Sequence, residues 1–443
     1  MDAREVALLT LFACERQGAW SDGYLKKTIR EAKLDSRDGA LATRLCAGVL
    51  QTRMLIDFYL DHFSTVKLAK MEAKVLLALR LGVYQMLFLD RVPVSAAVNT
   101  SVELARKYAK NPKSAGLVNG ILRGISRNLE NLPQPGGAMA ERLAIQYSHP
   151  QWLVEEILAQ LGPEEGEALL RADNEPPAIY AQANPLKISP AELATRWTVE
   201  GVNWEAHPWL TGCFLLSGTG DLEKLPSFRE GLFTVQDPAA RLAVLAAGPK
   251  PGMRVLDVCA APGGKSFAAA QEMKNQGEIH SCDIHPHKQA LIEKGAERLG
   301  ITCMTAQTQD GKSFRPEWEE AFDLVIADVP CSGLGVIRKK PDIRYKDPTP
   351  LEGLPKVQRA ILENVSRYVK PGGVLLYSTC TVLRRENEVV FSEFVDKHKA
   401  FTTENFQLPV PVNDIKNGML TLWPQRHGTD GFFIAKLRKK DQT

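Results

Sequence analysis

The segment RVLDVCAAPGGKSFAAAQEM, residues 254–273, decides which fold this chain adopts. Val255 and Leu256 begin an apolar run that predicts a short strand, and the residues from Lys265 onward predict a helix. The turn between them consists of small residues and includes Gly263 and Gly264. Small residues let a ligand approach the backbone closely, and a helix N-terminus offers free N–H donors. The segment therefore predicts a ligand-binding strand, turn and helix.

The pattern of glycines narrows the class of ligand. The turn has neither the GxGxxG pattern of dinucleotide sites nor the GxxxxGK[ST] pattern of triphosphate sites. Asp283 follows at the end of the next expected strand, where an acid typically accepts hydrogen bonds from ribose hydroxyls. The expected ligand is a nucleoside without a large phosphate group.

Strand-like and helical runs alternate from residue 236 to the end of the sequence. This alternation predicts a doubly wound parallel sheet, a Rossmann-like α/β domain over residues 236–443. Ligands of such sheets bind at the carboxyl ends of the strands. The chemically useful side chains expected there are Asp257, Cys259, Asp283, Asp310, Asp328, Cys331 and Cys380. Their common location predicts a single site.

The rest of the chain has a different character. Residues 1–130 place apolar side chains three and four apart, which predicts a compact all-helical domain, and Ser21 and Ser36 stand where helix N-caps are expected. The run from Met71 to Asp90 is apolar nearly all round, as in the central helix of a bundle. Residues 131–165 predict a linker and a helix, and residues 166–235 predict a small α/β subdomain.

Composition excludes several classes of function. The eight cysteines have no CxxC spacing, which argues against a zinc site or a disulfide framework and for reduced thiols in the cytoplasm. The longest apolar stretch contains Arg80, so we expect no membrane span. Residues 1–150 hold 21 Lys and Arg against 14 Asp and Glu, a net charge of +7, which leaves −4 for the remainder. This asymmetry suggests a polyanionic partner, although helices with solvated basic faces would give the same count.

Two thiols follow strand-like runs, Cys331 in IADVPCSGLG and Cys380 in VLLYSTC. The residues alone leave open which of them is the nucleophile. A lone cysteine is usually a small buried hydrophobe, and we expect that role for Cys14, Cys46, Cys213, Cys282 and Cys303.

The motifs LDVCAAPGGK, ADVPCSGLGVIRKKPDIRY and YSTC, in this order, resemble the RNA cytosine-C5 methyltransferases that use S-adenosyl-L-methionine. The helical first third, with RVPVSAAVNTSVELA and LVNGILR, is similar to the RNA-binding NusB domain. This pairing resembles the RsmB (Sun/Fmu) branch of that family, which modifies small-subunit ribosomal RNA. The motifs YSHPQWLV, VQDPAA and GTDGFFIAKL extend the resemblance over nearly the whole chain.

The resemblance implies a role for each matching position. The cofactor loop, which would hold the methionine part of S-adenosyl-L-methionine, consists of Cys259, Ala260, Ala261, Pro262, Gly263, Gly264 and Lys265. Asp283 would bind the ribose hydroxyls, Asp310 the adenine amino group, and Asp328 would lie beside the methyl group and the target base. Cys380 would be the nucleophile, and Cys331 would assist release of the product.

These assignments fit the chemistry of cytosine. C5 of cytosine is a weak nucleophile, and adding a thiolate to C6 places electron density on C5. A free thiol is only roughly 3% ionised at pH 7, a deficit of about 2 kcal/mol that a nearby cation such as Lys265 reduces. The base must also leave its stack, so the expected target lies in a loop or a disrupted helix of RNA.

The expected partner is 16S ribosomal RNA, at a target of the cytosine-967 type, with no membrane or metal and with the chain acting as a monomer. The basic loop after Cys331 predicts phosphate contacts by Arg338, Lys339, Lys340 and Arg344, or else a merely solvated loop. Transfer RNA is the alternative substrate, and an RNA-binding scaffold with a degenerate methyltransferase half is the alternative function. The intact acids and thiols count against the scaffold. An amino-methylating enzyme is disfavoured because Asp328 is followed by Val-Pro-Cys.

Overall fold

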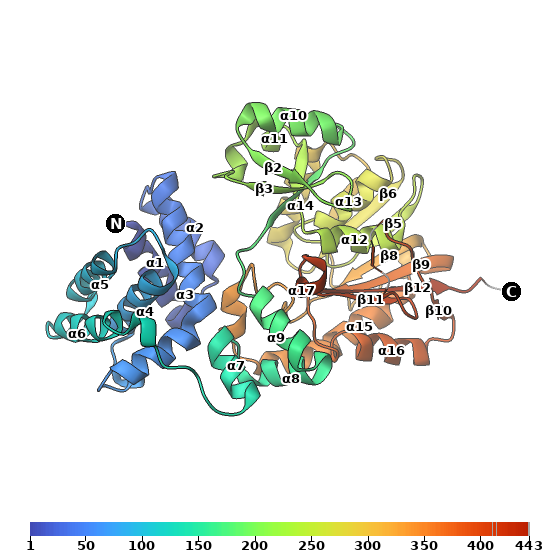
Figure 1. The fold of residues 1–443 in the computed structure, drawn as a ribbon. Coiled ribbons are helices and arrows are strands. Elements are labelled where there is room, and N and C mark those ends of the chain that lie inside the picture. The colour runs from blue at the N-terminus through green and yellow to red at the C-terminus, as the bar shows by residue number, and fades with distance from the viewer. Residues whose placement is uncertain (410, 413, 442–443) are drawn as a thin grey trace. The chain divides into compact units, whose positions relative to one another are not determined.

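The computed structural model describes residues 1–409, 411–412 and 414–441. The chain divides into two compact units: residues 1–175 with 337–346, and residues 176–336 with 347–443. Figure 1 shows the helices of the first unit in blue to green and the two sheets of the second unit. No helix among the described residues is long and apolar enough to cross a membrane.

The first unit is all-helical, as predicted. Its helices are α1 (Ala3–Gln17), α2 (Ser21–Glu31), α3 (Ser36–Phe63), α4 (Ala73–Phe88), α5 (Val94–Tyr108), α6 (Ser114–Ser126), α7 (Met139–Tyr147), α8 (Gln151–Leu161) and α9 (Pro163–Ala172), with short 3₁₀ turns η1 (Leu68–Lys70) and η2 (Leu129–Asn131). Helix α4 is buried on nearly every side, which confirms the expected central helix. Its Arg80 is retained in the core by bonds to Asp57 (2.7 and 2.8 Å) and Glu15 (2.5 Å).

The predicted serine N-caps were wrong by one position. Helices α2 and α3 begin at Ser21 and Ser36, so the capping positions are Trp20 and Asp35. The Asp35 carboxylate accepts a hydrogen bond from the Asp38 N–H (2.7 Å). An aspartate caps as well as a serine does, and here it stands one residue earlier.

The first unit is completed by a segment from far along the sequence, residues 337–346, which contains the 3₁₀ turn η5 (Pro341–Tyr345). The Tyr345 hydroxyl donates to the Leu50 carbonyl (2.7 Å), and the Arg53 guanidinium lies 3.5 Å from the centre of the Tyr345 ring. The Asp342 carboxylate accepts from the Ser21 N–H (3.0 Å). This segment is therefore part of the packed helical unit.

Arg344 is the centre of this attachment, and only 2% of it is exposed. Its guanidinium donates to acceptors at the end of α7, at the end of α9 and within α3: the carbonyls of Tyr147, Ser148, Asp173 and Gln51, and the Asn174 side chain, at 2.9 to 3.2 Å. The last carbonyls of a helix have no partner within the helix and carry partial negative charge. One arginine thus satisfies the ends of two helices.

The second unit contains a small antiparallel sheet of order β2-β3-β1-β4. Its elements are β1 (Ile179–Ala183), α10 (Pro190–Glu200), β2 (Asn203–Ala206), β3 (Cys213–Ser217), η3 (Leu222–Lys224), α11 (Pro226–Arg229) and β4 (Phe233–Val235). Trp197 of α10 is fully buried against Phe214 and Phe233 of the sheet. The Asn184 side chain donates to the Leu299 carbonyl (2.9 Å), which joins this subdomain to the following domain.

The larger sheet has the order β10-β12-β9-β8-β5-β6-β7, and β11 pairs with β12. Its strands are β5 (Arg254–Asp257), β6 (Glu278–Asp283), β7 (Met304–Thr308), β8 (Phe322–Asp328), β9 (Val369–Thr379), β10 (Phe401–Thr403), β11 (Met419–Leu422) and β12 (Phe432–Lys439). Strands β5 to β9 pair in parallel, and β12 runs antiparallel to β9. This arrangement confirms the predicted Rossmann-like fold, with an antiparallel addition at one edge.

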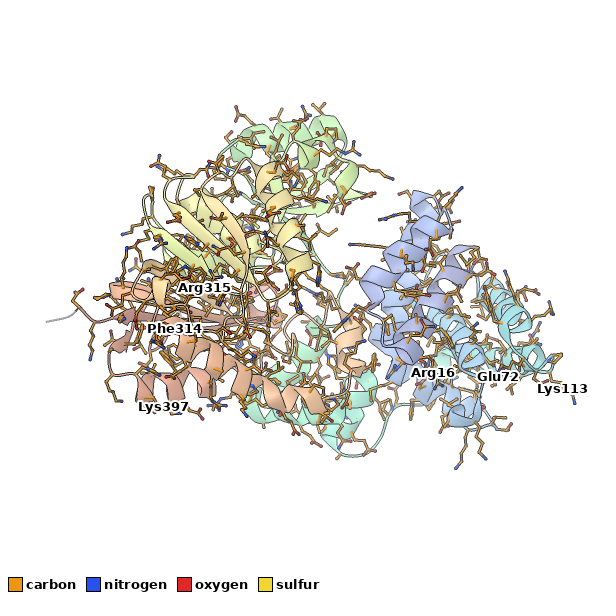
Figure 2. The ribbon with its side chains drawn as sticks, turned by 180° about the vertical axis from the view of Figure 1, so that it is seen from behind. Arg16, Glu72, Lys113, Phe314, Arg315 and Lys397 are labelled. Carbon is orange, nitrogen blue, oxygen red and sulfur yellow. The ribbon has the colours of Figure 1, made fainter. Side chains whose placement is uncertain are left out.

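The helices and 3₁₀ turns of this domain connect the strands. They are α12 (Pro238–Ala247), α13 (Gly264–Glu272), α14 (Pro286–Leu299), η4 (Pro316–Trp318), η6 (Thr349–Gly353), α15 (Leu354–Ser366), α16 (Glu388–Lys397) and α17 (Pro424–His427). Apolar residues fill both faces of the sheet. Phe314, labelled in Figure 2 on the connection between β7 and β8, stacks on Tyr368, and the neighbouring Arg315 covers the Trp318 ring.

We predict that Arg344→Ala lowers the free energy of unfolding of the first unit by about 3 to 5 kcal/mol, because several buried acceptors lose a charged donor. Hydrogen exchange of the α3 amides in the full chain measures this free energy for that unit. Lys340→Ala, which removes an exposed cation from the same segment, is the control. Equal protection of α3 in the two variants would contradict the structural role of Arg344.

Candidate active site

The carboxyl ends of five parallel strands meet at one edge of the large sheet. Strands β5, β6 and β8 end at Asp257, Asp283 and Asp328, and Asp310 lies two residues beyond β7. The strand order reverses between β5 and β8, which are adjacent in the sheet. Ligands of doubly wound sheets bind at such a reversal. The predicted acids and thiols thus follow neighbouring strand ends at this edge of the sheet.

The two thiols face each other within this site. Strands β8 and β9 pair in parallel, with Asp328 opposite Ser378. Cys331 and Cys380 therefore lie just beyond the ends of two neighbouring strands. Their sulfur atoms are 3.3 Å apart, and both residues are partly exposed. The hydrogen bond to Cys380, together with burial, raises the pKa of Cys331 well above its ordinary value. Cys331 is therefore held as a neutral thiol beside the sulfur of Cys380.

Lys265 supplies the positive charge that the sequence suggested. Lys265 lies in the first turn of α13, and its ammonium group donates to the Asp328 carboxylate (2.6 Å). Burial lowers the pKa of Lys265, but the charges of Asp328, Asp257 and Cys380 outweigh that effect and raise it. A lysine that remains protonated near Cys380 favours the thiolate form of that cysteine.

Asp328 is oriented from two sides. Lys265 donates to one carboxylate oxygen, and the Ser378 hydroxyl donates to the other (2.8 Å). A carboxylate has about four lone-pair sites, so each oxygen can accept one more hydrogen bond. The side chain is thus fixed in place while it retains the capacity to bind an amino group.

The turn from Cys259 to Lys265 is tightly built. The Ala260 N–H donates to the Cys282 carbonyl (2.7 Å), and the Gly263 N–H donates to the Ala260 carbonyl (2.7 Å). Gly263 has φ +111°, and a Cβ added there would lie 2.3 Å from the Phe267 ring. Burial raises the pKa of the Cys259 thiol well above its ordinary value, so this sulfur stays neutral. The turn leads into α13, whose first N–H groups have no partner within the helix.

Asp257 is fully buried beneath this turn. One of its oxygens accepts from the Ser266 hydroxyl (2.7 Å), and the other has no hydrogen-bond partner within the described structure. Burial raises the pKa of Asp257 to about 7, an effect that the Ser266 hydrogen bond only partly offsets. The carboxyl group therefore titrates near neutral pH.

Asp283 and Asp310 lie at the ends of neighbouring strands. Asp283 is 6% exposed and accepts from the His285 N–H (3.0 Å). Asp310 accepts from the Lys312 N–H (3.0 Å). Both carboxylates retain free lone pairs for hydroxyl or amino groups, as a nucleoside requires.

The basic loop differs from the expectation. Arg338 and Arg344 are buried, 7% and 2% exposed, and Arg344 serves the helix ends of the first unit. Lys340 is exposed and Lys339 is half-buried. The sequence pattern could not separate these residues, because the acceptors of Arg344 lie more than 160 positions away. Of these four cations, Lys339 and Lys340 are the more exposed.

Sequence reasoning missed three polar residues around the thiols: Ser332, Gln358 and Glu386. The Glu386 carboxylate accepts from the Ser332 N–H (2.9 Å) and from the Gln358 amide (2.8 Å). The one available signal was Glu386 itself, an acid six residues beyond Cys380, whose partners cannot be identified from spacing. Among the described residues, no group of His, Cys, Asp and Glu could hold a metal ion.

The strand order, the glycine turn before α13 and the acids at the strand ends are those of a Rossmann-like methyltransferase. Residues 244–438 match the family model described as 16S rRNA methyltransferase RsmB/F, residues 1–127 match the NusB family, and residues 149–223 match the RsmF/B-like ferredoxin-like domain. The chain is 38% identical to the probable ribosomal RNA small subunit methyltransferase B of Bacillus subtilis, over 99% of this chain and 98% of that protein. The protein of that name from Synechocystis is 34% identical, over 99% and 100%. The chain belongs to the ribosomal RNA small subunit methyltransferase B family.

Solved structures agree with this assignment. The crystal structure of PH0851 superposes with a TM-score of 0.83 at 26% identity and covers 99% of both chains. A methyltransferase homologue from Pyrococcus horikoshii superposes with a TM-score of 0.59 at 27% identity, over 69% of this chain and all of that one. NSun6 from the same organism, solved with SFG, shares the fold with a TM-score of 0.59 at 22% identity, over 66% and 99%.

The enzyme uses S-adenosyl-L-methionine, and the residues of the site fit this cofactor. Carboxylates at successive strand ends suit the amino and hydroxyl groups of a nucleoside. Asp257 adds a buried carboxylate oxygen without a partner. The cofactor loop, Asp283, Asp310 and Asp328 are the residues that would hold it.

We predict that Asp257 makes the apoprotein less stable as pH rises from about 4 to about 7. Unfolded, its carboxyl group has a pKa of 3.8; folded, the pKa is about 7, so the folded state binds the extra proton in this interval. The difference in unfolding free energy between wild type and Asp257→Asn should therefore change by up to about 4 kcal/mol between pH 4 and pH 7.5. Urea denaturation of both proteins across this range measures it, and a constant difference would contradict the raised pKa.

Proposed function

We propose that this chain methylates C5 of a cytosine in 16S ribosomal RNA, through a covalent bond between Cys380 and C6 of the base. The observation that carries the proposal is the pair of thiols 3.3 Å apart at the reversal of strand order, beside the Lys265–Asp328 ion pair. The names of the relatives specify small-subunit ribosomal RNA, which favours this substrate over transfer RNA. The finer assignment, a target of the C967 type, rests on family resemblance.

The residues divide the chemistry as follows. S-adenosyl-L-methionine, when bound, supplies an electrophilic methyl group. The Cys380 thiolate adds to C6 and moves the electron pair of the C5–C6 double bond to C5. Asp328 accepts a hydrogen bond from the amino edge of the base and so holds the ring in position. After methylation, a water molecule from the solvent takes the C5 proton; the electron pair of the C5–H bond re-forms the double bond and expels the Cys380 thiolate, which Cys331 assists by donating a hydrogen bond to the departing sulfur.

Cys331 is suited to a role after attack because its raised pKa keeps it protonated. A neutral thiol can donate a hydrogen bond to the neighbouring sulfur as that sulfur departs with negative charge. Cys380, with Lys265 near it, is the better nucleophile. The proposal thus assigns attack to Cys380 and release to Cys331.

The substrate must reach this site as an unstacked base. We propose that the exposed Lys340 and the half-buried Lys339 contact phosphates, which position RNA without reading its sequence. Ribosomal RNA as the substrate places the proposed activity in the cytoplasm.

We predict that the two cysteine variants fail in different ways. Cys380→Ala should lose methyl transfer by more than about a thousandfold and still bind S-adenosyl-L-methionine, because the cofactor loop is intact. Cys331→Ala should instead accumulate a protein–RNA adduct that survives denaturing electrophoresis. Near-normal turnover by Cys380→Ala would refute the nucleophile assignment, and an inactive Cys331→Ala without adduct would refute the release role.

We predict that cells lacking this protein lose one 5-methylcytosine from 16S ribosomal RNA. Bisulfite sequencing of ribosomal and transfer RNA from that strain, with a strain complemented by Cys380→Ala as control, identifies the substrate. Loss of the modification from transfer RNA instead would identify the alternative substrate. Unchanged patterns in both RNAs would support the non-catalytic scaffold.

A further inference from the structure

The loop that carries Cys331 is fixed on both sides of the cysteine by two buried side chains. On one side, the Gln358 amide donates to the Pro330 carbonyl (3.0 Å). On the other side, the Ser332 N–H donates to the Glu386 carboxylate (2.9 Å). Gln358 also donates to the same Glu386 oxygen (2.8 Å), so one carboxylate connects both attachments. Glu386 therefore contributes to the position of Cys331, beside the bond between the Ser332 and Thr381 hydroxyls (2.7 Å) and the bond from the Gly335 N–H to the Cys380 carbonyl (3.0 Å).

Glu386 is itself fixed to the strand that carries Cys380. The Tyr377 hydroxyl of β9 donates to the Glu386 carbonyl (2.5 Å). The next residue, Asn387, accepts from the Thr379 hydroxyl (2.6 Å) and donates to the Thr381 carbonyl (3.0 Å), on either side of Cys380. Glu386 thus holds the Cys331 loop at a set place relative to the Cys380 loop.

This connection has an energetic cost that packing alone does not explain. Glu386 and Gln358 are both 0% exposed, and one oxygen of each side chain has no hydrogen-bond partner within the described structure. A buried carboxylate with an unsatisfied oxygen destabilises the fold, and an apolar pair of the same shape would fill the space at lower cost. The two hydrogen bonds that Glu386 and Gln358 make to the Cys331 loop give a reason for having this polar pair here.

We propose that Glu386 is a positioning residue that holds Cys331 against Cys380 for release of the methylated RNA. The inference rests on the proposed function, in which Cys331 acts after attack. Without the Glu386 carboxylate, the Ser332 N–H and the Gln358 amide lose their common acceptor. The Cys331 loop then keeps the bond between the Ser332 and Thr381 hydroxyls (2.7 Å) and the bond from the Gly335 N–H to the Cys380 carbonyl (3.0 Å), and the Cys331 sulfur is held less closely against that of Cys380. Cys380 keeps its own strand and its cation, so attack continues while release slows.

The first test follows the covalent adduct with 16S ribosomal RNA and the cofactor. Glu386→Ala is expected to accumulate denaturation-resistant adduct as Cys331→Ala does, with kcat lowered at least about tenfold and KM changed by less than about threefold. Glu386→Gln keeps an acceptor oxygen for the Ser332 N–H and should restore turnover. Glu386→Asp is too short by one methylene to reach both donors; it should resemble Glu386→Ala and serves as the second variant where alanine impairs folding.

Asp323→Ala is the matched control. Asp323 also accepts from a backbone N–H, that of Arg254 (2.7 Å), and from a side chain, Lys370 (3.0 Å), but it lies at the opposite end of β8. It should lose stability without accumulating adduct. If Glu386→Ala turns over normally, or loses adduct and methyl transfer together as Cys380→Ala does, the positioning role is wrong.

A second test needs no RNA and separates this inference from the proposed function. The rate of alkylation of Cys331 by iodoacetamide in the full-length apoprotein, located by mass spectrometry, reports the freedom of its loop. It should rise at least about tenfold in Glu386→Ala and Glu386→Asp, and stay near wild type in Glu386→Gln and Asp323→Ala. Unchanged alkylation overturns the positioning role. Raised alkylation with no adduct in either Glu386→Ala or Cys331→Ala would instead overturn the proposed release chemistry.

Discussion

The parallel register of β8 and β9 is the constraint on which the site depends. It places Asp328 opposite Ser378, so the loops that follow bring Cys331 and Cys380 to 3.3 Å from each other. A shift of one residue would turn alternate side chains to the other face of the sheet and would separate the thiols. The buried apolar residues on both faces of these strands fix that register. The packing of the core and the chemistry of the site therefore have the same origin.

The charged side chains near the thiols are the second determinant of the site. Lys265 donates to Asp328, and the charges of Asp328 and Asp257 help to raise the pKa of Lys265. The positive charge of Lys265 favours the thiolate form of the nearby Cys380. The hydrogen bond to Cys380 and burial raise the pKa of Cys331, and burial raises the pKa of Cys259, so both are held as neutral thiols.

Much of this could be predicted from the sequence, because strand ends in a doubly wound sheet meet at one edge. The alternation after residue 236 and the glycine turn at Gly263 were sufficient to place the acids and both thiols together. The buried position of Arg344 could not be predicted. A run of basic residues has the same sequence pattern whether its side chains are solvated or donate to helix ends, here between residues 147 and 174. The role of Glu386 could not be predicted for a similar reason, because its partners Ser332 and Gln358 are distant in the sequence.

The insertion of residues 337–346 into the helical unit has a consequence for the order in which the protein is made. Chains generally fold from the N-terminus as they leave the ribosome, one domain after another. Here the N-terminal unit lacks Arg344 and Tyr345 until synthesis has passed residue 345. By then strands β5 to β8 of the other unit already exist. Completion of the first unit is thus delayed until most of the second has been translated, and the two halves mature together.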